Sequence, residues 1–214
     1  MYGYIFFDLD GTLTDPGEGI TNSVSYALER FGIEVPEKPE LYKFIGPPLK
    51  DSFAKYYDMN TDECTLAVKY YREYYADKGI FENALYEGVE KMLSSIQESG
   101  RKIILATSKP DIYAERILDH FGILKYFDFA AGADLAETRV AKADVIAHAL
   151  SSCRLHDKKN EILMVGDREH DVIGAAAHGI VTLGVTYGYG SKDELVSSGA
   201  KYLAESPLQI LDFI

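Results

Sequence analysis

The stretch FFDLDGTLTD, residues 6–15, places two carboxylates immediately after a short apolar run. If the chain stays extended through Asp10, the two-residue period of a strand points Asp8 and Asp10 the same way. Gly11 and Thr12 then permit a tight turn whose backbone N–H groups can face an anion. Two carboxylates this close repel each other, so the stretch requires a positive partner from elsewhere.

A second acidic pair follows another apolar run in MVGDREHDV, residues 164–172. Asp167 and Asp171 are four residues apart, and if the segment begins a helix they lie on one face, one turn from each other. Two strand ends would then bring four carboxylates to one crevice. Because unpaired buried charges are costly, the pattern predicts a hard cation, and Mg²⁺ suits a site of oxygen ligands that includes waters and substrate phosphate.

Short apolar runs alternate along the chain with helix-length segments whose apolar residues are spaced by three and four. The runs suit buried parallel strands, predicted at residues 4–7, 102–106, 127–131, 162–165 and 180–185. Helices are predicted at residues 89–98, 112–121, 142–150 and 172–178. Gly122 and Gly179 are expected to end two of these helices, and Ser191 with Glu194 is typical of a capping box. The alternation indicates an α/β fold, a doubly wound parallel sheet.

Residues 18–83 break this alternation, because they hold helical patterns at 20–31, 49–57 and 62–76 but no convincing strand. We therefore expect an inserted α-helical domain at 18–83, within a sheet domain formed by residues 1–17 and 84–214. Half of the 16 tyrosines lie between residues 42 and 86. Packing inside the insert is their expected use, and stacking of one or two on a nucleobase is the alternative.

Two further positions offer groups that bind anions. Thr107 and Ser108 follow the predicted strand at 102–106, in a hydroxyl-rich turn that can donate hydrogen bonds to a phosphate. Lys142 opens a predicted helix and can add a positive charge. Such residues are also ordinary at helix ends, so they indicate a functional site only because the acidic pairs are also present. Acidic pair, hydroxyls, lysine and acidic pair form the set that phosphoryl transfer requires.

The order of these segments resembles the four motifs of the haloacid dehalogenase (HAD) superfamily. The matching residues are Asp8-Leu9-Asp10-Gly11-Thr12, Thr107-Ser108-Lys109, Lys142 and Gly166-Asp167-Arg168-Glu169-His170-Asp171. The resemblance spans essentially the whole chain. It implies a HAD-type, Rossmann-like core in which residues 18–83 are the small α-helical cap.

The resemblance also implies a role for each motif. Asp8 would be the nucleophile that forms an aspartyl-phosphate, and Asp10 would protonate the leaving oxygen and then deprotonate the hydrolytic water. The implied ligands of Mg²⁺ are Asp8, the main-chain carbonyl of Asp10, Asp167 and, as a further ligand or one step removed from the metal, Asp171. The residues implied to hold the phosphoryl oxygens are Thr107, Ser108 and Lys142.

Asp10 favours hydrolysis of a phosphate ester, because dehalogenases of this superfamily lack that second aspartate. The chain is most similar to phosphoglycolate phosphatase-like members and to bacterial 5'-nucleotidases near them. Ser108 stands where typical phosphoglycolate phosphatases have Asn, which weakens the glycolate assignment. An intramolecular phosphoryl transferase similar to β-phosphoglucomutase, or a non-catalytic phosphate-binding regulatory module, are the alternatives.

The overall composition limits the partners. A net charge of -12 over 214 residues, with no cluster of Lys and Arg, disfavours a nucleic-acid polymer or a membrane surface and leaves a small phosphorylated metabolite as the expected partner. The two cysteines show no metal-binding spacing. Without a signal-peptide pattern or an apolar span, we expect a cytoplasmic protein, as a monomer or homodimer.

Overall fold

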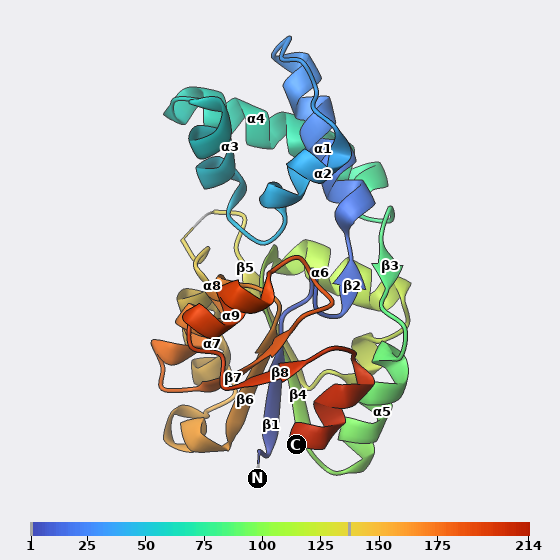
Figure 1. Ribbon diagram of the computed structural model, residues 1–214, viewed down its shortest axis with the longest axis vertical. Helices are drawn as coiled ribbons and strands as arrows, with labels where there is room; N and C mark the ends of the chain where they lie inside the picture. The colour runs from blue at the N-terminus through green and yellow to red at the C-terminus, as the bar shows by residue number, and fades with distance from the viewer. Residues whose placement is uncertain (1, 137) are drawn as a thin grey trace. The chain divides into compact units, whose positions relative to one another are not determined.

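The computed structural model describes residues 2–136 and 138–214 (Figure 1). The chain forms two compact units: the core unit, Met1–Thr14 with Leu85–Ile214, and the helical unit, Asp15–Ala84. None of the helices in the described part of the chain has both the length and the apolar character that a membrane span requires.

The boundaries of the units fall in a pair of very short strands. These are β2 (Thr14–Asp15) and β3 (Ala84–Leu85). The insert expected at residues 18–83 lies within the helical unit. Its role as a cap stays a prediction.

A six-stranded parallel sheet with the order β5-β4-β1-β6-β7-β8 forms the centre of the core unit. Its strands are β1 (Tyr4–Phe7), β4 (Lys102–Pro110), β5 (Phe129–Ala133), β6 (Ile162–Gly166), β7 (Val181–Val185) and β8 (Tyr202–Ala204). All five predicted strands are present, with β5 beginning two residues later than expected. The edge strand β8 was not predicted, because its three residues are too few to show a period.

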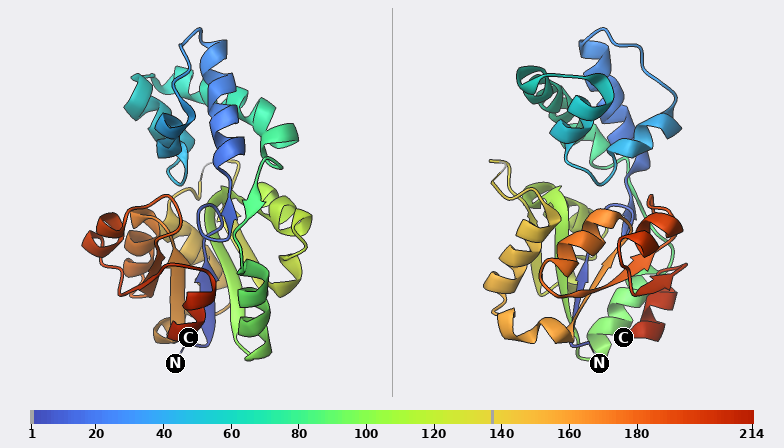
Figure 2. Two further views of the ribbon diagram at one scale, coloured as in Figure 1. Left: turned by 45° about the vertical axis from the view of Figure 1, so that its right-hand side comes forward. Right: turned by 60° about the vertical axis from the view of Figure 1, so that its left-hand side comes forward.

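Helices cover both faces of this sheet (Figure 2). α7 and α8 pack against one face, and α5, α6 and η5 lie on the other. The helical segments are α5 (Val89–Glu98), α6 (Asp111–His120), η3 (Leu124–Tyr126), α7 (Lys142–Ser152), η4 (His156–Glu161), α8 (Glu169–Ala176), α9 (Lys192–Ser197) and η5 (Leu208–Phe213). The predicted doubly wound α/β fold is therefore confirmed.

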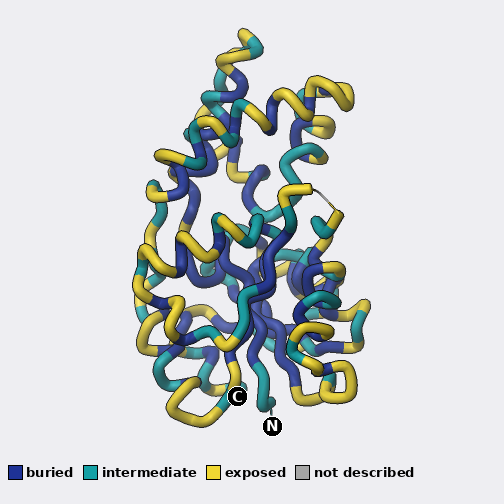
Figure 3. The backbone as a smooth tube through the Cα atoms, turned by 180° about the vertical axis from the view of Figure 1, so that it is seen from behind, coloured by how far each residue is buried: buried dark blue, intermediate teal, exposed yellow. Residues whose placement is uncertain are grey.

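The strands of the sheet are the most deeply buried part of the core unit (Figure 3). In β1, Ile5, Phe6 and Phe7 have no exposed surface. Phe6 and Met164 belong to an apolar cluster that also includes residues of α7. Burial on both faces explains why the strands appear in the sequence as continuous apolar runs rather than alternating ones.

The strand order fixes where the polar ends of the strands meet. β1 pairs with β4 on one side and β6 on the other, so that Phe7 is level with Leu105 and with Val165. The chain winds outward in both directions from β1, and such a switch point opens a crevice beyond the carboxyl ends of the strands. Asp8 and Asp167 directly follow β1 and β6, and both lie at this edge.

β4 runs four residues beyond its predicted end and is irregular there. Ala106 is paired with Ala131, and the next pair is Pro110 with Ala133, so β4 contains two more residues than β5 over this interval. Such a bulge changes the direction of side chains at a sheet edge. The bulge holds the three residues of the second motif, from Thr107 to Lys109.

The predicted helix ends are found with one change. Gly122 and Gly179 follow α6 and α8 with φ of 66° and 73°, the left-handed conformation expected of a C-cap glycine. Ser191 caps α9, where its hydroxyl accepts a hydrogen bond from Glu194 N at 3.0 Å. The Glu194 carboxylate is hydrogen-bonded to residues of α8 instead, so the capping-box prediction holds for Ser191 alone.

The helical unit contains α1 (Gly17–Arg30), α2 (Lys38–Leu41), η1 (Tyr42–Phe44), α3 (Leu49–Tyr57), α4 (Thr61–Tyr74) and a π-helical turn, η2 (Tyr75–Gly79). A complete capping box begins α4: Asn60 accepts from the Glu63 N–H, and the Glu63 carboxylate accepts from the Asn60 N–H. Local sequence therefore specifies the start of this helix.

Tyrosines of the helical unit pack on other aromatic rings of the same unit. The rings of Tyr71 and Tyr75 are stacked at 5.3 Å between centroids, and both side chains are buried. Tyr70 meets Phe31 edge-on at 5.9 Å. These contacts confirm packing as a use of the tyrosines, with the edge and stacked geometries that aromatic pairs prefer.

Candidate active site

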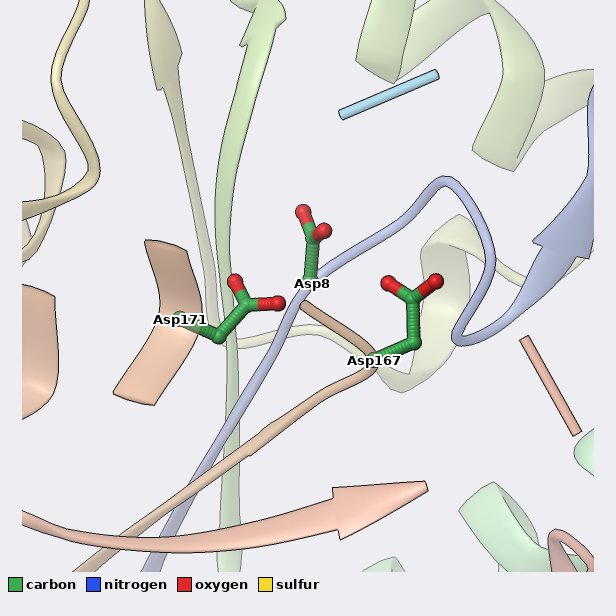
Figure 4. Close-up of side chains that lie close together, drawn as sticks. All are labelled: Asp8, Asp167 and Asp171. Carbon is green, nitrogen blue, oxygen red and sulfur yellow. The ribbon is translucent and has the colours of Figure 1, made fainter. Parts of the chain in front are cut away.

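Three carboxylates meet at the carboxyl edge of the central strands (Figure 4). Asp8 follows β1, Asp167 follows β6, and Asp171 lies in the first turn of α8. One oxygen from each carboxylate lies within 4.8 Å of the other two, and all three residues are buried. We call Asp8, Asp167 and Asp171 the acidic cluster.

The ammonium of Lys142, the first residue of α7, is the positive partner of the acidic cluster. Its Nζ lies 2.7 Å from Asp8 Oδ1 and 2.8 Å from Asp171 Oδ1, and it donates to the carbonyl of Ala106 at 2.9 Å. Burial lowers the pKa of Lys142, but Asp171 and Asp8 outweigh that effect and raise it, so the side chain stays charged. Its expected contact with phosphoryl oxygens stays a prediction.

One ammonium does not balance the acidic cluster. Three negative charges and one positive charge leave a formal charge of −2 in a buried space. Asp167 Oδ1 is buried and has no hydrogen-bond donor among the described residues. Burial, with Asp171 and Asp8 close by, raises the pKa of Asp167 well above its usual range, and burial raises the pKa of Asp171 to about 6.

These properties fit a divalent, hard cation. Buried carboxylates that repel one another are stable as anions only when a positive charge joins them. An oxygen-only donor set suits Mg²⁺ or another cation that prefers oxygen ligands. Asp8, Asp167 and Asp171 are the residues that could hold it.

The turn after β1 is shaped to fit against Asp167. Gly11 has φ of 79°, and a Cβ atom at this position would lie 2.2 Å from Asp167 Oδ2. That same oxygen accepts a hydrogen bond from the Tyr189 N–H at 2.8 Å. Position 11 therefore requires glycine both for its backbone conformation and for the space that the Asp167 carboxylate fills.

The backbone amides of this turn are used differently from the sequence expectation. The Gly11 N–H donates to the Thr14 carbonyl at 2.8 Å, and the Thr12 N–H donates to the Leu9 carbonyl at 3.2 Å. Both amides therefore close the turn on itself rather than facing an anion. The expectation was wrong because a tight turn satisfies its own N–H groups before any ligand does.

The carboxylate of Asp10 has a different partner from that of Asp8. Its Oδ2 lies 2.7 Å from Lys109 Nζ, and both side chains are almost fully buried. Burial raises the pKa of Asp10, Lys109 opposes the rise, and Asp8 adds to it. The structure thus brings together three of the four expected carboxylates and pairs the fourth with a lysine. The proposed metal contact of Asp10 through its carbonyl stays a prediction.

Lys109 was not identified as a site residue from the sequence. The bulge in β4 brings it to the site, since Thr107 Oγ1 accepts a hydrogen bond from the Lys109 N–H at 3.2 Å. Its place in the second motif, beside Thr107, was a usable signal that it lies near the site, but its pairing with Asp10 depends on the bulge.

The two predicted hydroxyls differ in their surroundings. Thr107 is buried, and because its oxygen already accepts a hydrogen bond, its O–H remains to donate to an acceptor. Ser108 is only half-buried. The phosphate-binding roles of both residues stay predictions.

The fold and the acidic cluster together define a class of α/β enzymes in which acidic residues at the ends of neighbouring parallel strands form a buried, negatively charged site. Residues 5–185 match the haloacid dehalogenase-like hydrolase family, and the chain belongs to that family. The resemblance inferred from the four motifs is thereby confirmed.

Similar proteins fit this assignment. The chain is 43% identical over 194 residues to a 5'-nucleotidase of Pseudomonas aeruginosa, covering 91% of this chain and 87% of that protein. It is 42% identical over 190 residues to the tyrosine-protein kinase PtkA of Mycobacterium tuberculosis, covering 88% of this chain and 64% of that protein. A crystal structure of a predicted phosphatase from Clostridium acetobutylicum superimposes with a TM-score of 0.95 at 45% identity, covering 99% of both chains. The family and the 5'-nucleotidase relative support a phosphatase, as the sequence predicts.

The close fit of Gly11 against Asp167 can be tested by substitution. Gly11→Ala is expected to lower the free energy of unfolding, measured by urea titration in chelator, because the methyl group meets both backbone strain and the Asp167 carboxylate. Gly100→Ala is the matched control, since Gly100 has φ of 80° and no atom within 4 Å of an added Cβ. The control is expected to lose about 1–2 kcal/mol from strain alone, and Gly11→Ala roughly 1–3 kcal/mol more from overpacking. Equal losses would contradict the close fit.

Proposed function

We propose that the protein is a Mg²⁺-dependent phosphatase that hydrolyses a small phosphomonoester through an aspartyl-phosphate formed on Asp8. The buried contact between Asp8 and Lys142, beside two further carboxylates, carries this proposal. A carboxylate held at a strand end, next to a fixed ammonium and a cation-binding pair, can attack phosphorus while the charge on the phosphoryl oxygens is offset.

The reaction assigns one job to each of the two neighbouring acids. The Asp8 oxygen that does not contact Lys142 attacks phosphorus, a P–O(Asp8) bond forms, and the ester P–O bond breaks. The leaving oxygen takes a proton from Asp10. Water then attacks phosphorus in the phosphoenzyme and gives a proton back to Asp10. This attack breaks the P–O(Asp8) bond, so that phosphate is released and Asp8 is regenerated. Burial supports this role, because it raises the pKa of Asp10 and so favours the protonated acid.

Lys142 and Thr107 support the same reaction. Lys142 fixes the orientation of Asp8 through its 2.7 Å contact and offsets negative charge near the attacked phosphorus. The Thr107 hydroxyl donates to a phosphoryl oxygen. Asp8, Asp167 and Asp171 are the residues that would hold Mg²⁺. When bound, the metal would supply positive charge that offsets the charge of the carboxylates and of the transferring phosphoryl group.

The names of the relatives and the presence of the helical unit support a proposal for the substrate class. We propose a nucleoside 5'-monophosphate as the first substrate to test, because a relative with 43% identity carries the name 5'-nucleotidase. Residues 18–83 would act as the cap that selects the leaving group. The segment Phe44-Ile45-Gly46-Pro47-Pro48-Leu49 resembles the cap substrate loop of the phosphoglycolate phosphatase-like members. It is the first place to introduce substitutions that would change which leaving group is accepted.

A phosphoryl transferase is the alternative that the comparisons keep open, because one relative bears the name of a tyrosine-protein kinase. The two functions differ in what accepts the phosphoryl group from Asp8. With a ³²P-labelled substrate, a phosphatase gives free phosphate in step with substrate loss. A transferase gives a labelled organic product or labelled protein instead.

The roles of the two acids can be separated with a nitrophenyl phosphate, whose leaving group departs without protonation. Asp8→Asn is expected to lose nitrophenol release by roughly four orders of magnitude or more, as nucleophile removal does in other enzymes. Asp10→Asn is expected to release about one equivalent of nitrophenol per enzyme in a burst and then stall, because water attack on the phosphoenzyme lacks its base. Stopped-flow absorbance measures both.

The exposed acid Asp193 gives the control for that experiment, as Asp193→Asn removes a charge from the core unit without touching the site. It is expected to turn over like the wild type. Steady turnover by Asp8→Asn would falsify the nucleophile assignment. Steady turnover by Asp10→Asn would instead remove Asp10 from the second step.

Removal of divalent cations is expected to stop phosphate release, and added Mg²⁺ to restore it. The physical reason is the formal charge of −2 left by the acidic cluster and Lys142. Mg²⁺ is also expected to raise the unfolding temperature of the protein without substrate, since a ligand that binds only the folded state stabilises it. Full turnover in excess chelator, or an unchanged unfolding temperature, would exclude this metal site.

The substrate is identified by a phosphate-release screen with Mg²⁺ over nucleoside monophosphates, phosphoglycolate, sugar phosphates and pyrophosphate. The expected result is the highest kcat/KM for a nucleoside monophosphate. A higher value for another compound would keep the phosphatase and replace the substrate.

A further inference from the structure

Glu194, on α9, makes two hydrogen bonds to the start of a different helix. Its Oε1 accepts from Arg168 Nε at 2.8 Å and from the Glu169 N–H at 2.9 Å. The partners are 26 and 25 residues away in sequence. From its position in the first turn of α9, Glu194 would be expected to serve only its own helix through Ser191.

The two partners form the turn that carries the acidic pair of the fourth motif. Arg168 is the N-cap of α8 and Glu169 its first residue. Asp167 immediately precedes them, and Asp171 is bound back to the same turn, because its Oδ2 accepts from the Arg168 N–H at 3.1 Å. A single carboxylate therefore holds the backbone between two members of the acidic cluster.

The electrostatics of this contact are favourable where those of the acidic cluster are not. Burial raises the pKa of Glu194, but the Glu169 amide and Arg168, with a smaller effect from the Ser191 amide, outweigh it and lower that pKa. The carboxylate also lies at the N-terminus of α8, where the helix dipole stabilises negative charge. The ionised carboxylate of Glu194 is thus stabilised by Arg168 and by backbone amides, without a metal ion.

Glu194 also lies close in sequence to the loop before α9, and this loop contacts Asp167. In the residues before α9, the Tyr189 N–H donates to Asp167 Oδ2 at 2.8 Å. A Cβ atom at Gly190 would lie only 1.9 Å from the Asp167 carbonyl oxygen, so the loop backbone and the turn are in close contact. Joining α9 to α8 through Glu194 keeps this contact in place.

We propose that Glu194 is a positioning residue of the metal site, which holds Asp167 and Asp171 at the separation that a divalent cation requires. It acts through Arg168 and Glu169 and does not contact the cation. This inference rests on the proposed function, because it assumes that the acidic cluster binds Mg²⁺. Loss of a residue that orients metal ligands commonly weakens metal affinity by about 10- to 100-fold.

The test measures Mg²⁺ affinity on the full chain without substrate. Mg²⁺ chloride is titrated into the chelator-treated protein, and the dissociation constant is obtained by calorimetry and from the rise of the unfolding temperature. Glu194→Ala is expected to weaken Mg²⁺ binding by about 10- to 100-fold, the range for loss of a residue that orients ligands.

Two variants separate positioning from charge. Glu194→Gln removes the same charge but keeps an oxygen that can accept from Arg168 and Glu169. It is expected to weaken Mg²⁺ binding by about two- to tenfold, because uncharged hydrogen bonds are weaker but retain the geometry. Asp193→Ala removes an exposed charge from the same turn of α9 and is expected to bind Mg²⁺ like the wild type.

The outcomes distinguish this inference from the proposed function. If the wild type binds Mg²⁺ and Glu194→Ala binds it equally well, or if Ala and Gln at position 194 cause the same loss, the positioning role is overturned while the phosphatase stands. If Glu194→Ala does not fold, Glu194→Gln decides, and an affinity equal to the wild type overturns the role. If the wild type binds no Mg²⁺, the metal site and this inference both fail.

Discussion

Repulsion among three buried carboxylates is the constraint on which the core unit depends. Asp8, Asp167 and Asp171 lie within 4.8 Å of one another through one oxygen each, and all three residues are buried. Buried carboxylates that repel one another stay ionised only when a positive charge joins them. Here Lys142 bridges two of the carboxylates, and the turn at Gly11 and the Tyr189 amide confine the third. The groups that would surround the proposed cation therefore belong to the fold itself.

Parallel topology makes that concentration of charge possible. The acidic cluster and Lys142 are spread from Asp8 to Asp171 along the chain, yet each residue lies at the end of a strand or the beginning of a helix at one edge of the sheet. Because β1 is flanked by β4 and β6, the residues that follow β1 and β6 lie at the same edge of the sheet as the last part of β4.

How much could be predicted from the sequence depended on the range of the interaction. The ends of β1 and β6 were predictable because an apolar run that stops at Asp is a local signal. The pairing of Asp10 with Lys109 was not, since it depends on a bulge that sets β4 against β5. The carboxylate of Glu194 was assigned to its own helix because nothing local indicates a partner 25 residues away. Local rules locate the strand ends, and the packing of elements decides which side chains meet there.

The two acids of the first motif show what that packing achieves. Asp8 and Asp10 are separated by one residue, so the sequence alone predicts that their carboxylates repel each other. In the fold each carboxylate has its own ammonium at 2.7 Å, Lys142 for Asp8 and Lys109 for Asp10. Only Asp8 also shares its space with Asp167 and Asp171, where the proposed cation would bind. Asp10 lies outside that group, and burial raises its pKa. In the proposed reaction the nucleophile must stay ionised while the proton donor must be able to hold its proton, and the separate charge environments of the two residues would suit these different requirements.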